Sequence, residues 1–200
     1  MNYQSLINQY NIQSIKELNI LFWEEIAYKW IHTYKTTSTN YGTITLQNFS
    51  GYAFIIDDGN QLRNRQSLEK EILESRVVGA FGIANKKINP KNRNTMRRWI
   101  GKTTEVFRAY GNNYDKGHFI GHSFGGPIDV NLFPQISHIN RGLSNEGKKY
   151  RNMEKFISLN PGTFVFSRPI YNDLSFCPYL LEFGYCDASL RFNFKLFSNK

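Results

Sequence analysis

A histidine-rich segment in the second half of the chain holds the residues best suited to chemistry. It contains three of the four histidines, His118, His122 and His138, together with Asp115 and Asn140. A histidine side chain has an ordinary pKa of about 6.5, so it is mostly neutral at pH 7 and ready to act as a general base. Amide and carboxylate oxygens are the ligands that Mg²⁺ prefers. The segment therefore predicts proton transfer beside a hard cation.

Other chemistry in this segment is less well supported by the spacing. His118 and His122 would form an i,i+4 metal pair on a helix, but the intervening glycine and a strand placement disfavour it. His138 is expected to be structural or a loop contact. The run Gly121–Gly126 lacks the Gly-Lys-Ser/Thr end of a phosphate-binding loop, and Ser123 lacks the Gly-x-Ser-x-Gly elbow of serine hydrolases. We expect the end of that run to be a turn.

The spacing of the whole segment is more specific than its composition. It runs Asp115-Lys-Gly-His118, Phe-Ile-Gly-His and Phe-Gly-Gly-Pro, then Asn131-Leu-Phe-Pro-Gln and Asn140-Arg-Gly. This order resembles the DNA/RNA non-specific endonuclease family, and bacterial nuclease-toxin members most closely. The resemblance implies an α+β fold in which a mixed, largely antiparallel sheet carries a ββα-metal finger. It also implies a phosphodiester hydrolase acting on DNA and/or RNA with one Mg²⁺, or Mn²⁺ in its place.

Site roles follow from the resemblance position by position. His118 stands where the family has its general base, and Asn140 where it has the amide that holds the metal ion. Glu154 resembles the carboxylate of the finger helix that orients water on that ion. The interval from Asn140 to Glu154 is about six residues longer than in the shorter members of the family, so the helix either starts late or contains an insertion. Glu146 therefore competes with Glu154 for the same role. The pattern Tyr-Arg-Asn-Met-Glu favours Glu154, since it puts the carboxylate beside a buried helical face.

Three charged residues complete the candidate catalytic set. The resemblance implies that Asp115 braces the strand that carries the base. Lys116 replaces the family's arginine, which keeps the charge but gives up a planar fork that binds phosphate in bidentate fashion. Arg141 directly follows Asn140 and is the third charged candidate. One usable imidazole and no thiol argue against zinc.

The elements that must position this segment are visible along the 200-residue chain. Ser14 and Glu17 form a capping-box pattern before an i+4 apolar stripe, which predicts an N-terminal helix. We therefore divide the chain into a helical appendage, residues 1–40, and a nuclease domain, residues 41–200. We also expect a hairpin, in which the strands Gly42–Gln47 and Gly51–Asp57 are joined by Asn48–Ser50. A short charged helix is expected at Ser67–Glu74, and a further strand at Thr103–Tyr110.

Charge favours a polyanionic partner. There are 25 Lys and Arg residues against 16 Asp and Glu residues, a formal net charge of +9. The most basic segment, Lys86–Arg98, reads equally well as a solvated loop and as a phosphate-contacting loop. The rival hypothesis is a non-catalytic basic nucleic-acid-binding module. A toxic role would add an inhibitory immunity protein as a partner.

Cysteine spacing and hydropathy exclude further classes of protein. Cys177 and Cys186 can form at most one bridge and lack the paired spacing of a structural zinc site, so this is not a disulfide scaffold. No signal peptide or membrane span is recognisable. We expect no membrane partner, and a protein that is either cytoplasmic or exported by a signal-independent route.

Overall fold

The core of the fold is a six-stranded antiparallel sheet. The computed structural model describes residues 2–38, 40–59, 75–85, 111, 113–127 and 130–200. The strands of the sheet are β1 (Ile44–Phe49), β2 (Tyr52–Asp57), β3 (Arg76–Ile83), β6 (Phe164–Ile170), β7 (Leu180–Cys186) and β8 (Phe192–Ser198). Their order is β1-β2-β3-β6-β7-β8, and every neighbouring pair is antiparallel.

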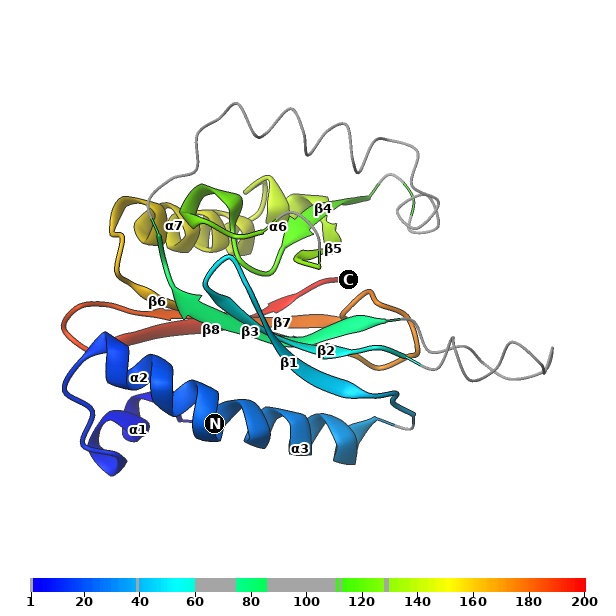
Figure 1. The fold of residues 1–200 in the computed structure, drawn as a ribbon. Coiled ribbons are helices and arrows are strands. Elements are labelled where there is room, and N and C mark those ends of the chain that lie inside the picture. Colours follow the sequence, from blue (N-terminus) through cyan, green and yellow to red (C-terminus); the bar gives the residue numbers. More distant parts are fainter. Residues whose placement is uncertain (1, 39, 60–74, 86–110, 112, 128–129) are drawn as a thin grey trace.

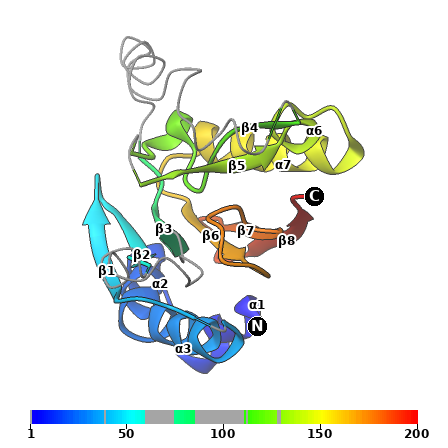
Figure 2. The ribbon, with the colours of Figure 1, turned by 90° about the vertical axis from the view of Figure 1, so that its right-hand side faces the viewer.

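Separate layers cover the two faces of this sheet (Figures 1 and 2). One layer holds the N-terminal helices α1 (Tyr3–Gln9), α2 (Ile15–Leu21) and α3 (Ala27–Thr37), with a π-helical turn, η1 (Phe22–Ile26), between the last two. The opposite layer holds β4 (Tyr114–His118), the 3₁₀ turn η3 (His122–Phe124), β5 (Leu132–Ile136), α6 (Ser137–Asn140) and α7 (Asn145–Leu159). The predicted α+β class with a largely antiparallel sheet is confirmed.

Strand alternation gives the sheet an apolar surface on both sides. On β2, Tyr52 and Phe54 point to the layer of β4, β5 and α7, whereas Ala53 and Ile55 point to the N-terminal helices. All four side chains are buried. The sheet therefore has two cores, one on each face, and the candidate active-site layer rests on one of them.

The N-terminal helices share a core with the sheet. The Ser14 side chain accepts a hydrogen bond from the Glu17 backbone N–H, which confirms one half of the predicted capping box, while the Glu17 carboxylate accepts from the Gln13 N–H and not from that of Ser14. The predicted apolar stripe is buried; its members are Leu18, Phe22, Ile26 and Trp30. Trp30 packs over Gly79, where a Cβ would lie 2.6 Å from the indole. Helix α1, which precedes the stripe, was not expected from the sequence. The division at residue 40 stays a prediction.

The predicted hairpin is present, but its turn lies further along the chain. Phe49 pairs with Tyr52, so the loop is Ser50-Gly51 and not Asn48–Ser50. Both loop residues have positive φ angles, 55° and 85°, as the two-residue turns favoured in twisted hairpins require. Glycine at the second position makes this shift possible.

Several sequence expectations lie outside the described residues. They are the helix at Ser67–Glu74, the basic segment Lys86–Arg98 and the strand at Thr103–Tyr110. Within the described part of the chain, no helix is long and apolar enough to cross a membrane. Cys177 and Cys186 are not joined by a disulfide.

Stability should depend on a buried tyrosine at alkaline pH. The Tyr52 hydroxyl donates to the Phe124 carbonyl, and burial raises the pKa of Tyr52 to about 12. Its contribution is fully present below the unfolded pKa of about 10 and is lost as pH rises toward 12. Wild type should be more stable than Tyr52→Phe by about 1 kcal/mol at pH 8, and this advantage should vanish near pH 11.

Urea unfolding at the two pH values measures this difference. Tyr41→Phe, at an exposed side chain, is the control and should change stability little at either pH. An advantage of wild type over Tyr52→Phe that is unchanged at pH 11 would show that the hydroxyl is not buried as a donor.

Candidate active site

Strand β4 carries the histidine motif and is fixed by its pairing with β5. Asp115 lies opposite Gln135, and His118 lies opposite Leu132 at the end of the ladder. Because side chains alternate along a strand, Lys116 and His118 share one face while Asp115 lies on the other. The motif residues are therefore divided between the two faces of a short two-stranded sheet.

The loop after His118 is held by a buried amide. Asn131 is fully buried; its Oδ1 accepts from the Ile120 N–H at 2.7 Å, and its Nδ2 donates to the carbonyls of Ile120, at 2.6 Å, and Pro127, at 2.9 Å. Gly125 has a φ of 98°, which agrees with the expected turn. His122 lies in η3 and not on a helix with His118. Among the described residues, no three His, Cys, Asp or Glu side chains cluster as a metal site.

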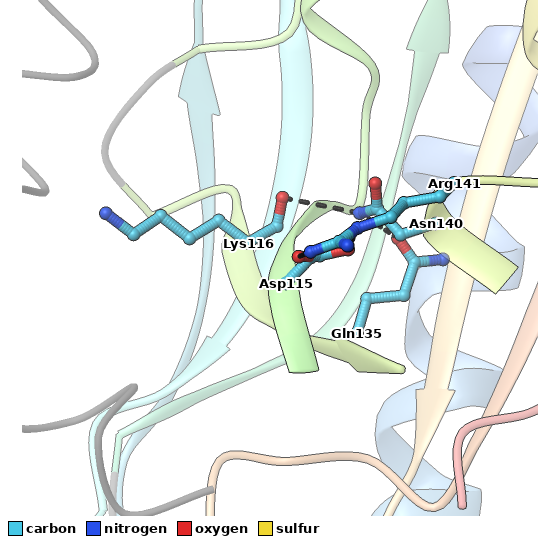
Figure 3. A network of polar contacts seen from close by, with 5 residues as sticks. All are labelled: Asp115, Lys116, Gln135, Asn140 and Arg141. Carbon is cyan, nitrogen blue, oxygen red and sulfur yellow. Dashed lines mark hydrogen bonds and ion pairs between the residues drawn. The ribbon is translucent and has the colours of Figure 1, made fainter. Parts of the chain in front are cut away.

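The Asn140 side chain has a defined orientation. Its Nδ2 donates to Gln135 Oε1 at 2.9 Å and, at 3.4 Å, to the backbone carbonyl of Lys116 (Figure 3). An amide whose nitrogen is engaged in this way presents its oxygen on the opposite side. Figure 3 shows that oxygen turned away from Gln135. Helix α6 ends at Asn140, and α7, the helix that carries Glu154, begins only at Asn145. Of the two alternatives for the longer spacing, the structure therefore shows the late start.

A buried pair of polar side chains, Gln135 and Tyr150, lies beneath Asn140. Gln135 is 2% exposed and Tyr150 on α7 is also buried. Burial raises the pKa of Tyr150 well above its usual range, and the adjacent Gln135 side chain lowers it. The Tyr150 hydroxyl in turn lies 3.5 Å from the His118 carbonyl oxygen, to which it donates. Sequence analysis missed both residues, although Gln135 closes the Asn-Leu-Phe-Pro-Gln motif.

The two candidate glutamates have different surroundings. Glu154 follows Tyr150 by one helical turn and is largely buried, and burial raises its pKa to about 6 despite a 2.9 Å ion pair with Arg151. Its charge also raises the pKa of Tyr150, so the two groups are close. Glu146 instead lies in the first turn of α7 and pairs with Lys195 of β8 at 2.7 Å. Of the two glutamates, Glu154 is therefore the one that lies near Tyr150.

Asp115 and Arg141 connect the strand to the segment after Asn140. The guanidinium binds both carboxylate oxygens, at 2.7 Å from Nε and 2.5 Å from Nη2, and the carboxylate raises the pKa of Arg141 (Figure 3). The Arg141 side chain is 58% exposed, so the pair contributes orientation more than stability. Lys116 extends away from this pair in Figure 3, and partial burial lowers its pKa.

Comparison with known proteins identifies the family of this chain. The family model for DNA/RNA non-specific endonucleases matches residues 73–186, more than half of the chain. The chain belongs to that family, so it is a nuclease that hydrolyses nucleic acid. Among solved structures, that of Sda1 nuclease with a bound zinc ion is similar at 16% identity, with a TM-score of 0.38, over 84% of this chain and 81% of that one. No curated protein sequence matches.

The loop after His118 should depend strongly on Asn131. Asn131→Ala removes three buried hydrogen bonds and leaves the Ile120 N–H and C=O without their partner. We expect the free energy of unfolding to fall by about 2 to 4 kcal/mol, measured by urea denaturation. Asn48→Ala is the matched control, because this exposed amide accepts one bond from Gly51. Equal losses in the two variants would contradict the assigned role of Asn131.

Proposed function

We propose that this nuclease is a metal-dependent endonuclease of DNA and/or RNA in which His118 is the general base. Asn140 and Glu154 would hold or orient a single Mg²⁺, with Mn²⁺ as an alternative. The observation that carries the proposal is the Asn140 amide, whose nitrogen is bound to Gln135 so that its oxygen is directed away. Residues 41–200 would form the catalytic unit.

The donor set suits Mg²⁺. An amide oxygen and a carboxylate are hard ligands, and Mg²⁺ is usually held by one or two protein oxygens with water in the remaining positions. Zinc sites use three or four nitrogen, sulfur or carboxylate ligands, and the described residues contain no such His/Cys/Asp/Glu cluster. When bound, the ion would neutralise phosphate charge and stabilise the leaving oxygen.

The residues of the chain supply the remaining steps. The imidazole of His118 would accept a proton from the attacking water, because a neutral histidine is available at pH 7. The Asp115–Arg141 pair would hold β4 against the segment that ends in Asn140. Lys116 would supply positive charge on the same strand face as His118.

Binding of a polymer is supported by the outer surface of α7. Its exposed side chains include the cations Lys148, Lys149, Arg151 and Lys155, next to the buried Glu154. Contacts of this kind bind phosphates without reading bases, so sequence selectivity should be low. The rival proposal of a non-catalytic basic module explains this surface, but it does not explain why Asn140, Gln135 and Tyr150 are linked. An inhibitory partner protein stays a prediction.

Loss of the base should abolish turnover selectively. His118→Ala should lower kcat by about two to four orders of magnitude while leaving DNA binding nearly intact, because the side chain acts in proton transfer. The measurement is plasmid cleavage in Mg²⁺ together with fluorescence anisotropy on a DNA duplex. His138→Ala, at an exposed residue, is the control and should retain activity. Turnover equal to wild type in His118→Ala would remove this residue from the mechanism.

Loss of the metal-holding groups should be visible in the Mg²⁺ dependence. Asn140→Ala should raise the Mg²⁺ concentration for half-maximal activity by at least about tenfold, and excess Mg²⁺ should partly restore the rate. Glu154→Ala should behave in the same way. Glu146→Ala is the control, since its carboxylate pairs with Lys195. If Glu146→Ala were inactive and Glu154→Ala active, the assignment of the helix carboxylate would be reversed.

A further inference from the structure

We propose that Gln135 is a positioning residue that sets the direction of the Asn140 amide and links it to the strand carrying His118. The inference rests on the proposed function, because it assigns the cause of the orientation that a metal-holding amide needs. Gln135 itself would touch neither the ion nor the nucleic acid. It would act through Asn140 on one side and Tyr150 on the other.

The Gln135 amide oxygen is bound to Asn140. It accepts from Asn140 Nδ2 at 2.9 Å, and the Gln135 side chain lies close enough to Tyr150 to lower the pKa of that hydroxyl. A carbonyl oxygen cannot bind an amide oxygen, so Gln135 selects the flip state of Asn140 in which the nitrogen faces inward. The opposite flip would direct N–H groups to the place of the cation. The second partner of Asn140, the Lys116 carbonyl at 3.4 Å, is too distant to enforce this choice alone.

Gly117 of the neighbouring strand β4 leaves the space that the Gln135 side chain occupies. A Cβ at Gly117 would lie 2.5 Å from Gln135 Cβ and 2.6 Å from its Oε1. Any larger residue at Gly117 would displace the Gln135 side chain from its bond to Asn140. The absence of a side chain at Gly117 is thus required for Gln135 to reach the candidate metal-holding amide of Asn140.

The Tyr150 end connects this arrangement to the base. The Tyr150 hydroxyl lies 3.5 Å from the His118 carbonyl, at the outer limit of a hydrogen bond, so α7 meets the end of β4 at this point. Contacts therefore lead from Asn140 through Gln135 and Tyr150 to the backbone of His118. They involve α6, β5, α7 and β4, so these four elements must pack as one unit.

Mn²⁺ binding without nucleic acid tests the proposal directly. Electron paramagnetic resonance of Mn²⁺ titrated into the full chain reports metal affinity independently of cleavage. Gln135→Met fills a similar volume without the acceptor and should weaken Mn²⁺ binding about ten- to a hundredfold, as loss of an outer-shell partner typically does. Gln135→Glu retains an oxygen acceptor for Asn140 and should stay within about threefold of wild type. Plasmid cleavage by Gln135→Met should show a lower kcat with KM unchanged.

Asn199→Leu is the control for general loosening of the strand. This buried amide also holds β5, through Ile136 N–H and the Pro134 carbonyl, but it does not contact Asn140. It should lose stability and keep its Mn²⁺ affinity. Equal Mn²⁺ affinity in Gln135→Met and wild type, or equal weakening in Asn199→Leu, would overturn the positioning role.

Two further measurements keep the result unambiguous. In an Asn140→Ala background, Gln135→Met should cause little additional loss of Mn²⁺ affinity, because it acts through the missing amide; additive losses would overturn the proposal. If Gln135→Met does not fold, Tyr150→Phe should still weaken Mn²⁺ binding about threefold, and wild-type affinity in it would count against the proposal. Failure of the proposed function would look different, since wild type itself would then not bind Mn²⁺ or would cleave DNA in EDTA.

Discussion

The hydrogen bond between the side-chain amides of Asn140 and Gln135 is the interaction on which the site depends. It joins the end of α6 to β5, and through Tyr150 it reaches α7 and the last residue of β4. Because all of these groups are largely buried, each must be satisfied inside the protein or pay a desolvation penalty. The polar cluster therefore forms where α6, β5, α7 and the end of β4 meet. That requirement places the candidate metal-holding amide and the candidate base on one rigid support.

The six-stranded sheet supplies that support from below. The face toward α7 is covered by aromatic side chains, and the Tyr150 ring lies tilted against Phe183 and edge-on to Phe197, with ring centroids 4.9 and 5.2 Å away. The N-terminal helices bury the opposite face with Phe22 and Trp30. Because the central strands are apolar on both faces, each face must be covered by a layer of other elements. The N-terminal helices cover one face, and the layer of β4, β5 and α7 covers the other.

Local patterns predicted much of the fold. Ser14 and Glu17 specify a helix start through their own side chains, and the apolar run from Tyr52 to Ile56 favours a strand, so these elements could be predicted directly. The hairpin turn was placed too early, because positive φ angles at Ser50 and Gly51 outweigh the general turn preference of Asn48. Sheet order could not be predicted, since β3 pairs with β6 across a long separation in sequence. Helix α1 lacks a pattern strong enough to be recognised from its seven residues.

The candidate site residues came from the family resemblance, and their supports could not be predicted. The motif from Asp115 to Glu154 singled out His118, Asn140 and Glu154 because it resembles the endonuclease family, and their roles stay predictions. Gln135 and Tyr150 could not be found in this way, since their importance lies in contacts between elements. The choice between Glu146 and Glu154 likewise depends on which face of α7 is buried.

The most direct test of the account is cleavage of supercoiled plasmid and of RNA by the wild-type chain, each with Mg²⁺ and with EDTA. We predict nicked, linear and then shortened products in Mg²⁺ and intact substrate in EDTA. Cleavage that persists in EDTA, or intact substrate at all Mg²⁺ and Mn²⁺ concentrations, would contradict the assignment of a metal-dependent nuclease built on His118 and Asn140.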